Sequence, residues 1–303
     1  MNTHRIKLGL KRPDQARLRA SLQAAKYVDV SAVKIPDGVV DWASKSTYDM
    51  YHNDTYGCCG PAGVANLVRQ MSANDGAPVH PTWDDVAAMY RAVGGWNGRD
   101  SGNGTDGGVD PLALMDYWRK VGIGGHRIEG YVLIDPNDTA LVDACLYMAG
   151  GLAIGFDMPS AWQQHVGDVW YGPKNPRSVP AGYQRGTWGG HFVAGSTSRD
   201  GVRQVATWGT QQKVTNAGFS YYCMFLAMPV SKLWFGADNK SPSGFDAETL
   251  LKDLDNIKQG RPVEGPPAKP SYVVPSAVRV PLELAGYKVH VPARSTDLFS
   301  VGA

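Results

Sequence analysis

Helix-like and strand-like segments occupy different halves of this chain. In the first half, apolar residues recur at i, i+3, i+4 and i+7 along one stretch, namely Val64, Leu67, Val68 and Met71. From Leu152 onward, segments rich in Val, Phe, Tyr and Trp are separated by turn residues, which is typical of strands. Because the helices and strands do not alternate along the chain, the sequence predicts an α+β fold rather than repeated βαβ units.

Periodicity and turn signals place the individual elements. We expect helices from the cysteine pair at 58–59 onward and at residues 14–27, 81–93, 110–120, 137–148 and 246–257. We expect strands at residues 152–156, 192–196, 202–208 and 219–228. The Gly-, Asn- and Asp-rich run 94–108 is predicted to be a long loop, and long loops beside a site are often functional.

Composition divides the chain into four parts. Residues 1–34 form a basic arm with eight Lys or Arg residues and two Asp residues. Residues 35–235 form the main domain, and residues 236–260 a helical extension. Residues 261–303 contain seven prolines and only short strand-like pieces, so this tail is not expected to build a core of its own. The arm is either a solvated surface stretch or a segment that docks on a partner.

Charge, cysteine count and motif spacing exclude several classes of function. A net charge of +2 argues against a general nucleic-acid binder. No C-x-x-C, H-x-x-x-H or phosphate-loop spacing is present, so we expect no metal and no cofactor. Four cysteines do not make a disulfide framework, and neither a signal peptide nor an apolar run of about 20 residues occurs. We expect a protein without a membrane span, in the reducing cytoplasm.

Two adjacent cysteines, Cys58 and Cys59, precede the apolar helix, and Pro61 marks its start. The unpaired N–H groups of a helix N-terminus favour thiolate over thiol, so this position is expected to lower the pKa of a cysteine. A buried packing role is the alternative, because most free cysteines are small core residues. Cys145 and Cys223, which lie in apolar runs, are interpreted as core residues.

A base for a cysteine nucleophile is offered by His191, which follows two glycines at the head of a predicted strand. It comes 132 residues after Cys59, within the roughly 130 to 150 residues that separate thiol and histidine in papain-type enzymes. By itself, a histidine in this position is more often a satisfied core residue.

Together, these residues resemble those of the papain-like cysteine peptidase superfamily over residues 35–230. The similar motifs are Ile35-Pro36 with Val40-Asp41-Trp42, Cys59-Gly60-Pro61-Ala62, and Gly189-Gly190-His191. The resemblance implies a helical N-terminal half packed against a C-terminal antiparallel sheet or barrel. It also implies hydrolysis of a peptide or protein substrate at an amide bond, with Cys59 as nucleophile and His191 as base.

The register of this resemblance assigns two further residues. The oxyanion-hole glutamine of the family lies six positions before its cysteine, and here that position is Asn53, which selects Cys59 over Cys58 as the nucleophile. The asparagine that holds the histidine lies in an Asn-Ser-Trp-Gly motif, which here reads Ala206-Thr207-Trp208-Gly209. Thr207 or Gln204 is the candidate substitute for the missing asparagine.

Short motifs also resemble uncharacterised papain-like proteins encoded by bacteriophages. They are Asn53-Asp54, Gly57-x-Cys59, Thr105-Asp106-Gly107-Gly108 and Gly189-Gly190-His191. This resemblance implies an alternative, a catalytically weak or inactive virion protein that docks on viral particle proteins through its arm and tail. The arm is much shorter than the inhibitory propeptide of papain precursors, so it is interpreted as a docking element rather than a propeptide.

Overall fold

The central element of the structure is a mixed, mostly antiparallel sheet. The computed structural model describes residues 6–99, 104–236, 239–246 and 252, and within them the strand order is β2-β8-β3-β5-β6-β7-β4, with β1 paired to β5. The strands are β1 (Val40–Asp41), β2 (Ile128–Leu133), β3 (Leu152–Met158), β4 (Val169–Trp170), β5 (Gly189–Arg199), β6 (Val202–Thr207), β7 (Thr210–Thr215) and β8 (Cys223–Ser231). All pairs are antiparallel except β4 with β7.

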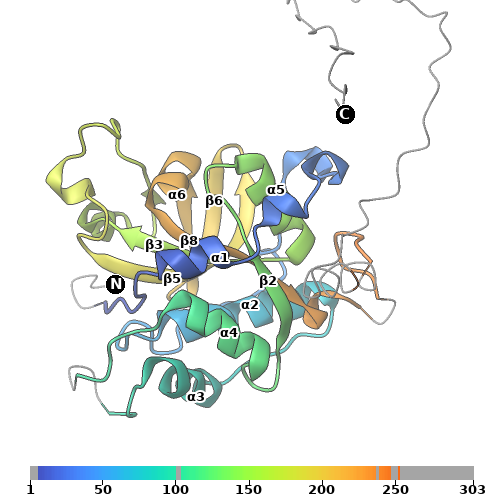
Figure 1. Ribbon diagram of the computed structural model, residues 1–303, viewed down its shortest axis with the longest axis horizontal. Helices are drawn as coiled ribbons and strands as arrows, with labels where there is room; N and C mark the ends of the chain where they lie inside the picture. The colour runs from blue at the N-terminus through green and yellow to red at the C-terminus, as the bar shows by residue number, and fades with distance from the viewer. Residues whose placement is uncertain (1–5, 100–103, 237–238, 247–251, 253–303) are drawn as a thin grey trace, which may run out of the picture. The chain divides into compact units, whose positions relative to one another are not determined.

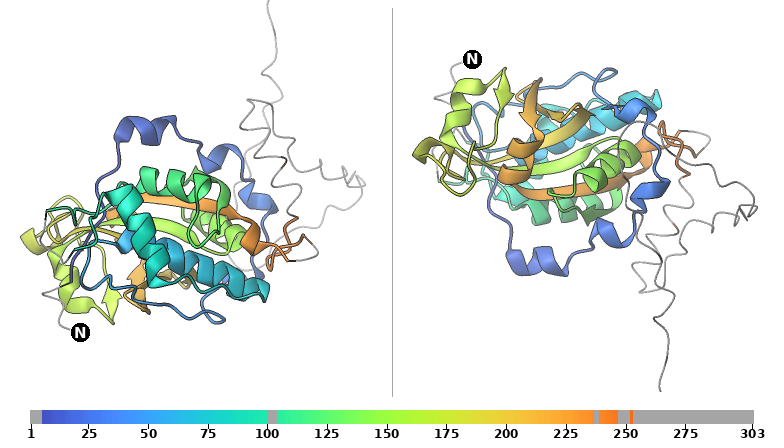
Figure 2. Two further views of the ribbon diagram at one scale, coloured as in Figure 1. Left: turned by 90° about the horizontal axis from the view of Figure 1, so that it is seen from below. Right: turned by 90° about the horizontal axis from the view of Figure 1, so that it is seen from above.

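Helices cover both faces of this sheet. They are α1 (Gln15–Ala20), α2 (Cys59–Asp75), α3 (Trp83–Gly94), α4 (Pro111–Lys120), α5 (Thr139–Ala149) and α6 (Asn216–Tyr222). Figure 1 shows α2, α3 and α4 on one side of the strands and α5 and α6 on the other. The N-terminal segment, drawn in blue, follows the periphery of the helices and strands (Figure 2).

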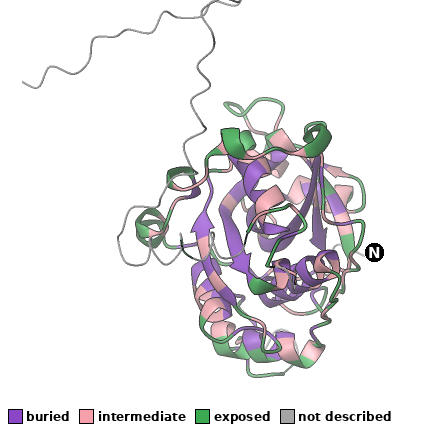
Figure 3. Ribbon diagram, turned by 90° about the vertical axis from the view of Figure 1, so that its right-hand side faces the viewer, coloured by how far each residue is buried: buried purple, intermediate pink, exposed green. Residues whose placement is uncertain are grey.

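Alternation along the central strands creates two apolar cores. On β3, Ala153 belongs to the core on the α2 side, and Ile154 to the core on the α5 side. On β5, Phe192 likewise belongs to the core on the α2 side, and Val193 to the core on the α5 side. Successive side chains on a strand point to opposite faces, so each central strand contributes to both cores. Strand β3 is accordingly buried along its whole length, and β5 and β8 are buried over most of theirs (Figure 3).

Helix α2 packs closely on strand β5 because it carries glycine at the contact. A Cβ added at Gly63 would lie 2.4 Å from the Phe192 ring. Further along α2, the amide Nε2 of Gln70 donates to the carbonyl oxygens of Gly150, at 2.6 Å, and Gly195, at 3.0 Å. These buried hydrogen bonds fix the helix against the sheet. The start of α2 and the start of β5 therefore lie side by side.

Most predicted elements are confirmed. The structure has the α+β fold, the long helix that begins at the cysteine pair, and the helices predicted at 81–93, 110–120 and 137–148, each within a few residues. The strands predicted at 152–156, 192–196 and 202–208 are parts of β3, β5 and β6. Strands β2 and β7 were not predicted from the sequence. The helix predicted at 246–257 and the tail 261–303 lie outside the described residues, apart from 246 and 252.

Two predicted segments differ from the structure. The strand predicted at 219–228 is wrong in its first part, where helix α6 occupies residues 216–222. The Thr215 side chain caps this helix by accepting from the Gly218 N–H, so a local polar contact overrides the strand propensity of the aromatic residues. The helix predicted at 14–27 ends at Ala20, because Ser21 has an extended backbone.

Candidate active site

Cys59 is the first residue of helix α2, and its side chain is fully buried. Its Sγ accepts a hydrogen bond from the backbone N–H of Phe192, at 3.4 Å. Phe192 directly follows His191 on strand β5, so the fold brings the thiol to the backbone beside His191 across 132 positions of the chain. No described hydrogen bond joins Sγ to the imidazole itself. Cys58, Cys145 and Cys223 are also buried, which agrees with the packing role expected of the latter two.

His191 is held on one side by a hydroxyl group and on one face by an indole ring. Its Nε2 lies 2.6 Å from Oγ1 of Thr207. The Trp208 ring stacks on the imidazole, with centroids 4.6 Å apart and planes 21° from parallel. The other ring nitrogen, Nδ1, is buried without a hydrogen-bond partner among the described residues. Trp208 belongs to the Ala206–Gly209 motif, but the sequence did not predict that its ring would stack on His191.

Of the two candidate substitutes for asparagine, only Thr207 contacts the histidine. The two lie three positions apart on β6, so their side chains leave the strand on opposite faces. Gln204 lines a hollow together with Asp41 and Lys213, where it makes no described contact with His191.

Burial keeps the Cys59 thiol and the His191 imidazole uncharged near neutral pH in this conformation. Burial raises the pKa of Cys59 to about 11, although backbone N–H groups of Phe192, Gly9 and Gly60 lower it in part. Burial lowers the pKa of His191 to about 3. The predicted lowering of the thiol pKa is therefore wrong for this state, because removing the sulfur from water outweighs the field of the helix N-terminus.

Asn53, the expected oxyanion donor, lies in a tight turn six residues before Cys59. The residue is buried, and its side-chain Oδ1 has no hydrogen-bond partner among the described residues. The two preceding residues, Tyr51 and His52, have φ angles of 48° and 53°. The unpartnered atom is an acceptor, whereas an oxyanion would need the Nδ2 donor of this side chain. No described hydrogen bond joins the Asn53 side chain to Cys59 or His191.

The N-terminal arm lies across this site, which the sequence did not predict. The backbone N–H of Leu10 donates to the Gly190 oxygen at 2.9 Å, so the arm is bonded to the residue before His191. Val109 N–H donates to the Gly9 oxygen at 2.8 Å, and Lys11 N–H donates to the Val109 oxygen at 2.8 Å. Residues 9–11 therefore bridge β5 and the loop before α4, over the thiol of Cys59. At least residues 7–12 of the arm dock within the chain itself.

Glycines on β5 and in the loop before α4 allow the arm backbone to approach these segments closely. A Cβ added at Gly108 would lie 2.1 Å from the Gly9 oxygen, and one added at Gly190 would lie 2.0 Å from the Leu10 oxygen. On the arm, a Cβ at Gly9 would lie 1.9 Å from the Gly57 oxygen. Backbone therefore meets backbone at these contacts, and side chains larger than hydrogen are excluded.

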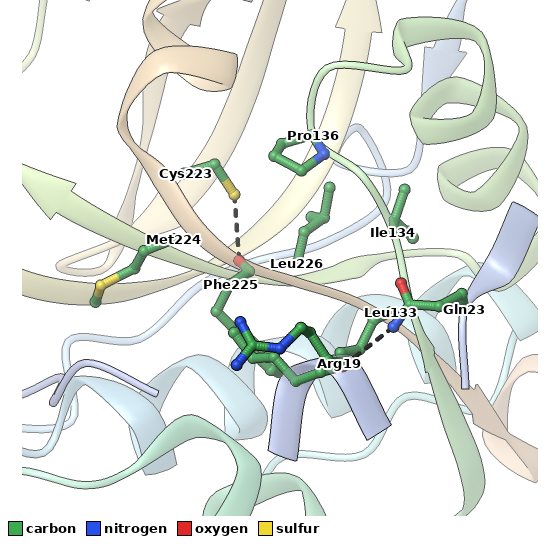
Figure 4. A pocket seen from close by; sticks show the side chains of 10 residues that line it. Arg19, Gln23, Leu133, Ile134, Pro136, Cys223, Met224, Phe225 and Leu226 are labelled. Carbon is green, nitrogen blue, oxygen red and sulfur yellow. Dashed lines mark hydrogen bonds between the residues drawn. The ribbon is translucent and has the colours of Figure 1, made fainter. Parts of the chain in front are cut away.

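A hollow of about 430 Å³ lies beside the arm (Figure 4). Its walls come from residues 133–136 and from residues 223–226 of β8, with Arg19 and Gln23 of the arm at its edge. Neither Cys59 nor His191 lines it, so it is separate from the candidate active site. Within the described residues, no three His, Cys, Asp or Glu side chains gather in a geometry that could hold a metal ion, and no helix is both long and apolar enough to cross a membrane.

Comparison with known proteins identifies the fold. No protein-family model matches the sequence, and no curated protein does. Among solved structures, xylellain, a cysteine protease from Xylella fastidiosa, superposes with a TM-score of 0.55 at 14% identity, over 75% of this chain and 97% of its own. The fold is that of the papain-like cysteine proteases.

Two further solved structures have lower scores. Procathepsin B S9 from Trypanosoma congolense has a TM-score of 0.49 at 11% identity, over 76% of this chain and 88% of its own. Digestive procathepsin L 3 from the Tenebrio molitor larval midgut has a TM-score of 0.45 at 13% identity, over 71% of this chain and 77% of its own. At these identities the similarity concerns the fold alone.

Proposed function

We propose that this chain is a thiol hydrolase that cleaves peptide bonds, with Cys59 as nucleophile and His191 as base. The proposal is supported above all by the hydrogen bond from Phe192 N–H to Cys59 Sγ, because it seats the thiol next to His191 at the start of a papain-like helix. The contact between Thr207 and Nε2 leaves Nδ1 of His191 as the ring nitrogen free to take a proton.

The reaction would proceed in two stages. Nδ1 of His191 takes the proton of the Cys59 thiol as the sulfur attacks the carbonyl carbon of the substrate, and the oxyanion is held by the Cys59 N–H and the Asn53 side chain. The C–N bond then breaks, and the imidazolium returns the proton to the leaving amine. Water, deprotonated by His191, next attacks the carbonyl carbon of the thioester. The C–S bond then breaks, the imidazolium returns the proton to the sulfur, and the acid product leaves the free thiol.

Thr207 is proposed to orient His191 in place of the asparagine found in similar sequences. In protein whose arm is displaced by Gly9→Val, the further change Thr207→Val keeps the shape of the side chain but removes its hydroxyl group, so we expect kcat to fall by about 10- to 100-fold with little change in KM. Thr207→Ser should restore most of the rate because it restores the hydroxyl group. If the Val variant kept the full kcat, Thr207 would have no orienting role.

The proposed function is tested by peptide hydrolysis. Full-length protein carrying Gly9→Val, a change that should displace the arm, is incubated with a library of internally quenched peptides. We expect amide hydrolysis that disappears when Cys59 is also replaced by Ala. Absence of hydrolysis from a folded protein with a reactive thiol would overturn the proposal.

A structural role in a viral particle is the second function suggested by sequence. It rests on docking by the basic arm and by the tail 261–303. Residues 7–12 of that arm are bonded within the chain, and the tail lies outside the described residues. No observation on the described part of the chain favours this role over hydrolysis.

A further inference from the structure

Residues 7–12 of the arm lie between β5 and the loop before α4, and we call the space that they fill the cleft. This segment has a cation at each end, and each cation pairs with a carboxylate. Lys7 Nζ lies 2.6 Å from Oδ2 of Asp106, and Arg12 Nη2 lies 2.6 Å from Oδ2 of Asp157. We propose that the same carboxylates select the substrate, so that the enzyme prefers an extended basic peptide. This inference rests on the proposed thiol hydrolase function and adds the class of its substrate.

Asp106 is a buried carboxylate whose cationic partner comes from the arm. Its side chain is 1% exposed, and it accepts hydrogen bonds from the Gly57 N–H, at 2.8 Å, and from the hydroxyl group of Tyr90. Both of these donors are neutral, whereas Lys7 supplies the opposite charge. A buried ion that loses its partner is costly, so an open cleft would favour a substrate that brings a new cation. The Lys7 side chain is 31% exposed, so solvent reaches this position.

Asp157 occupies the corresponding place at the other end of the segment. It lies on β3 and pairs with Gly190, the residue before His191. Its side chain is 11% exposed, whereas that of Arg12 is 71% exposed, so the carboxylate lies in the wall and the cation lies above it. A Cβ added at Gly186 would lie 2.6 Å from Oδ1 of Asp157, and glycine there leaves the carboxylate accessible.

Between the two carboxylates, the cleft discriminates by size. The position of Gly9 admits no side chain, because a Cβ there would lie 1.9 Å from the Gly57 oxygen. The next position takes Leu10, which is 6% exposed and lies over Gly155, where an added Cβ would be 2.6 Å from Leu10 Cδ2. The peptide sequence expected to bind best therefore has, in the order of residues 7–12, a cation, any residue, glycine, a leucine-sized residue, any residue and a second cation.

The order of these positions does not fix the chain direction of a substrate. The arm pairs with the loop before α4 through a parallel bridge between Leu10 and Val109. A substrate that runs in the opposite direction would place the same side chains in reverse order. Test peptides are therefore made with the sequence of residues 6–13 and with its reversal.

Binding is measured separately from catalysis. Full-length Gly9→Val protein is mixed with each peptide, and protection of Cys59 from iodoacetamide is followed by mass spectrometry. We expect the better of the two unmodified peptides to protect Cys59. Replacing both its Lys7 and Arg12 equivalents by Glu should raise the half-protecting concentration about 100-fold, at about tenfold for each charged hydrogen bond. Replacing the Lys11 equivalent by Glu is the matched control and should have little effect, because no carboxylate in the described part of the chain pairs with Lys11.

Exchanging the charges of Asp157 and of the Arg12 equivalent distinguishes specific recognition from non-specific binding. In an Asp157→Lys protein, the peptide with Glu at the Arg12 position should bind better than the unmodified peptide. A peptide with Val at the Gly9 position should not protect Cys59 in any variant. If Gly9→Val does not fold, the full-length Lys7→Ala/Arg12→Ala protein replaces it in these experiments. Its arm loses both ion pairs and is therefore expected to leave the cleft.

The outcomes separate this inference from the proposed function. Equal protection by unmodified and charge-reversed peptides, or hydrolysis of library peptides without preference for basic ones, would overturn the inference alone. Charge-dependent protection without hydrolysis of any peptide would support the basic-peptide site and overturn the proposed function. Charge-dependent protection together with faster hydrolysis of basic peptides would support both.

Discussion

Replacing Gly9 by Val is expected to raise the rate at which iodoacetamide alkylates Cys59 at pH 7 by at least about 100-fold. A Cβ at this position would lie 1.9 Å from the Gly57 oxygen, so the arm cannot keep its place over the thiol. Burial raises the pKa of Cys59 from its ordinary 9.0 to about 11. Below both values, each pKa unit changes the thiolate fraction about tenfold, so loss of burial alone gives about 100-fold more thiolate. An imidazolium beside the sulfur would raise the thiolate fraction further, so this factor is a lower bound.

The measurement is the time course of Cys59 modification, followed by peptide mass spectrometry. In the unmodified protein, the rate should keep rising with pH until about pH 11, because thiolate forms only near the raised pKa. In the variant, the rise should come at lower pH. Gly182→Val is the matched control, since the nearest atom to an added Cβ there is 3.7 Å away. An unchanged rate in folded Gly9→Val protein would show that the arm does not shield the thiol.

Replacing Cys59 by Ala is expected to abolish peptide hydrolysis in the Gly9→Val protein, with a loss of about 10⁴-fold or more in kcat. The reason is that no other group in the site can form the thioester, and removal of a nucleophile typically costs losses of this size. The assay is the initial rate of hydrolysis of the best library peptide.

Cys58→Ala provides a control that differs by one position. The Cys58 thiol is buried, and it donates to the Tyr51 oxygen at 3.4 Å, away from Phe192 and His191. Burial raises the pKa of Cys58 well above its ordinary value, so it is a poor nucleophile in this state. Hydrolysis should persist in the Cys58→Ala protein. Loss of activity in the Cys58 variant and not in the Cys59 variant would reverse the assignment of the nucleophile.

Local sequence signals predicted the parts of the site that depend on neighbouring residues. The start of α2 at the cysteine pair follows from Gly57, Pro61 and the helical spacing after them, and the structure has that helix. The position of His191 at the head of a strand follows in the same way from its flanking glycines. The choice between Thr207 and Gln204 needed the structure, because side chains alternate between faces and the sequence does not show which face of β6 lies against His191.

The occupied cleft could not be predicted in this way. The Lys7–Asp106 and Arg12–Asp157 pairs join residues 99 and 145 positions apart. Basic residues in an arm are equally compatible with a solvated surface. Nothing in the sequence distinguishes Gly9 from other glycines, because its close contact with the Gly57 carbonyl group exists only in the folded chain. The raised pKa of the Cys59 thiol has the same origin, because it depends on what covers the sulfur rather than on the helix that carries it.

The pH dependence of Cys59 alkylation tests most directly whether Cys59 and His191 act as a pair. It is measured in the Gly9→Val protein with and without His191→Ala. An imidazolium beside the sulfur stabilises thiolate, so we expect rapid alkylation that persists well below pH 9 and is lost when His191 is replaced. A single titration near the ordinary thiol pKa of 9.0, identical in both proteins, would show that Cys59 and His191 do not act as a pair.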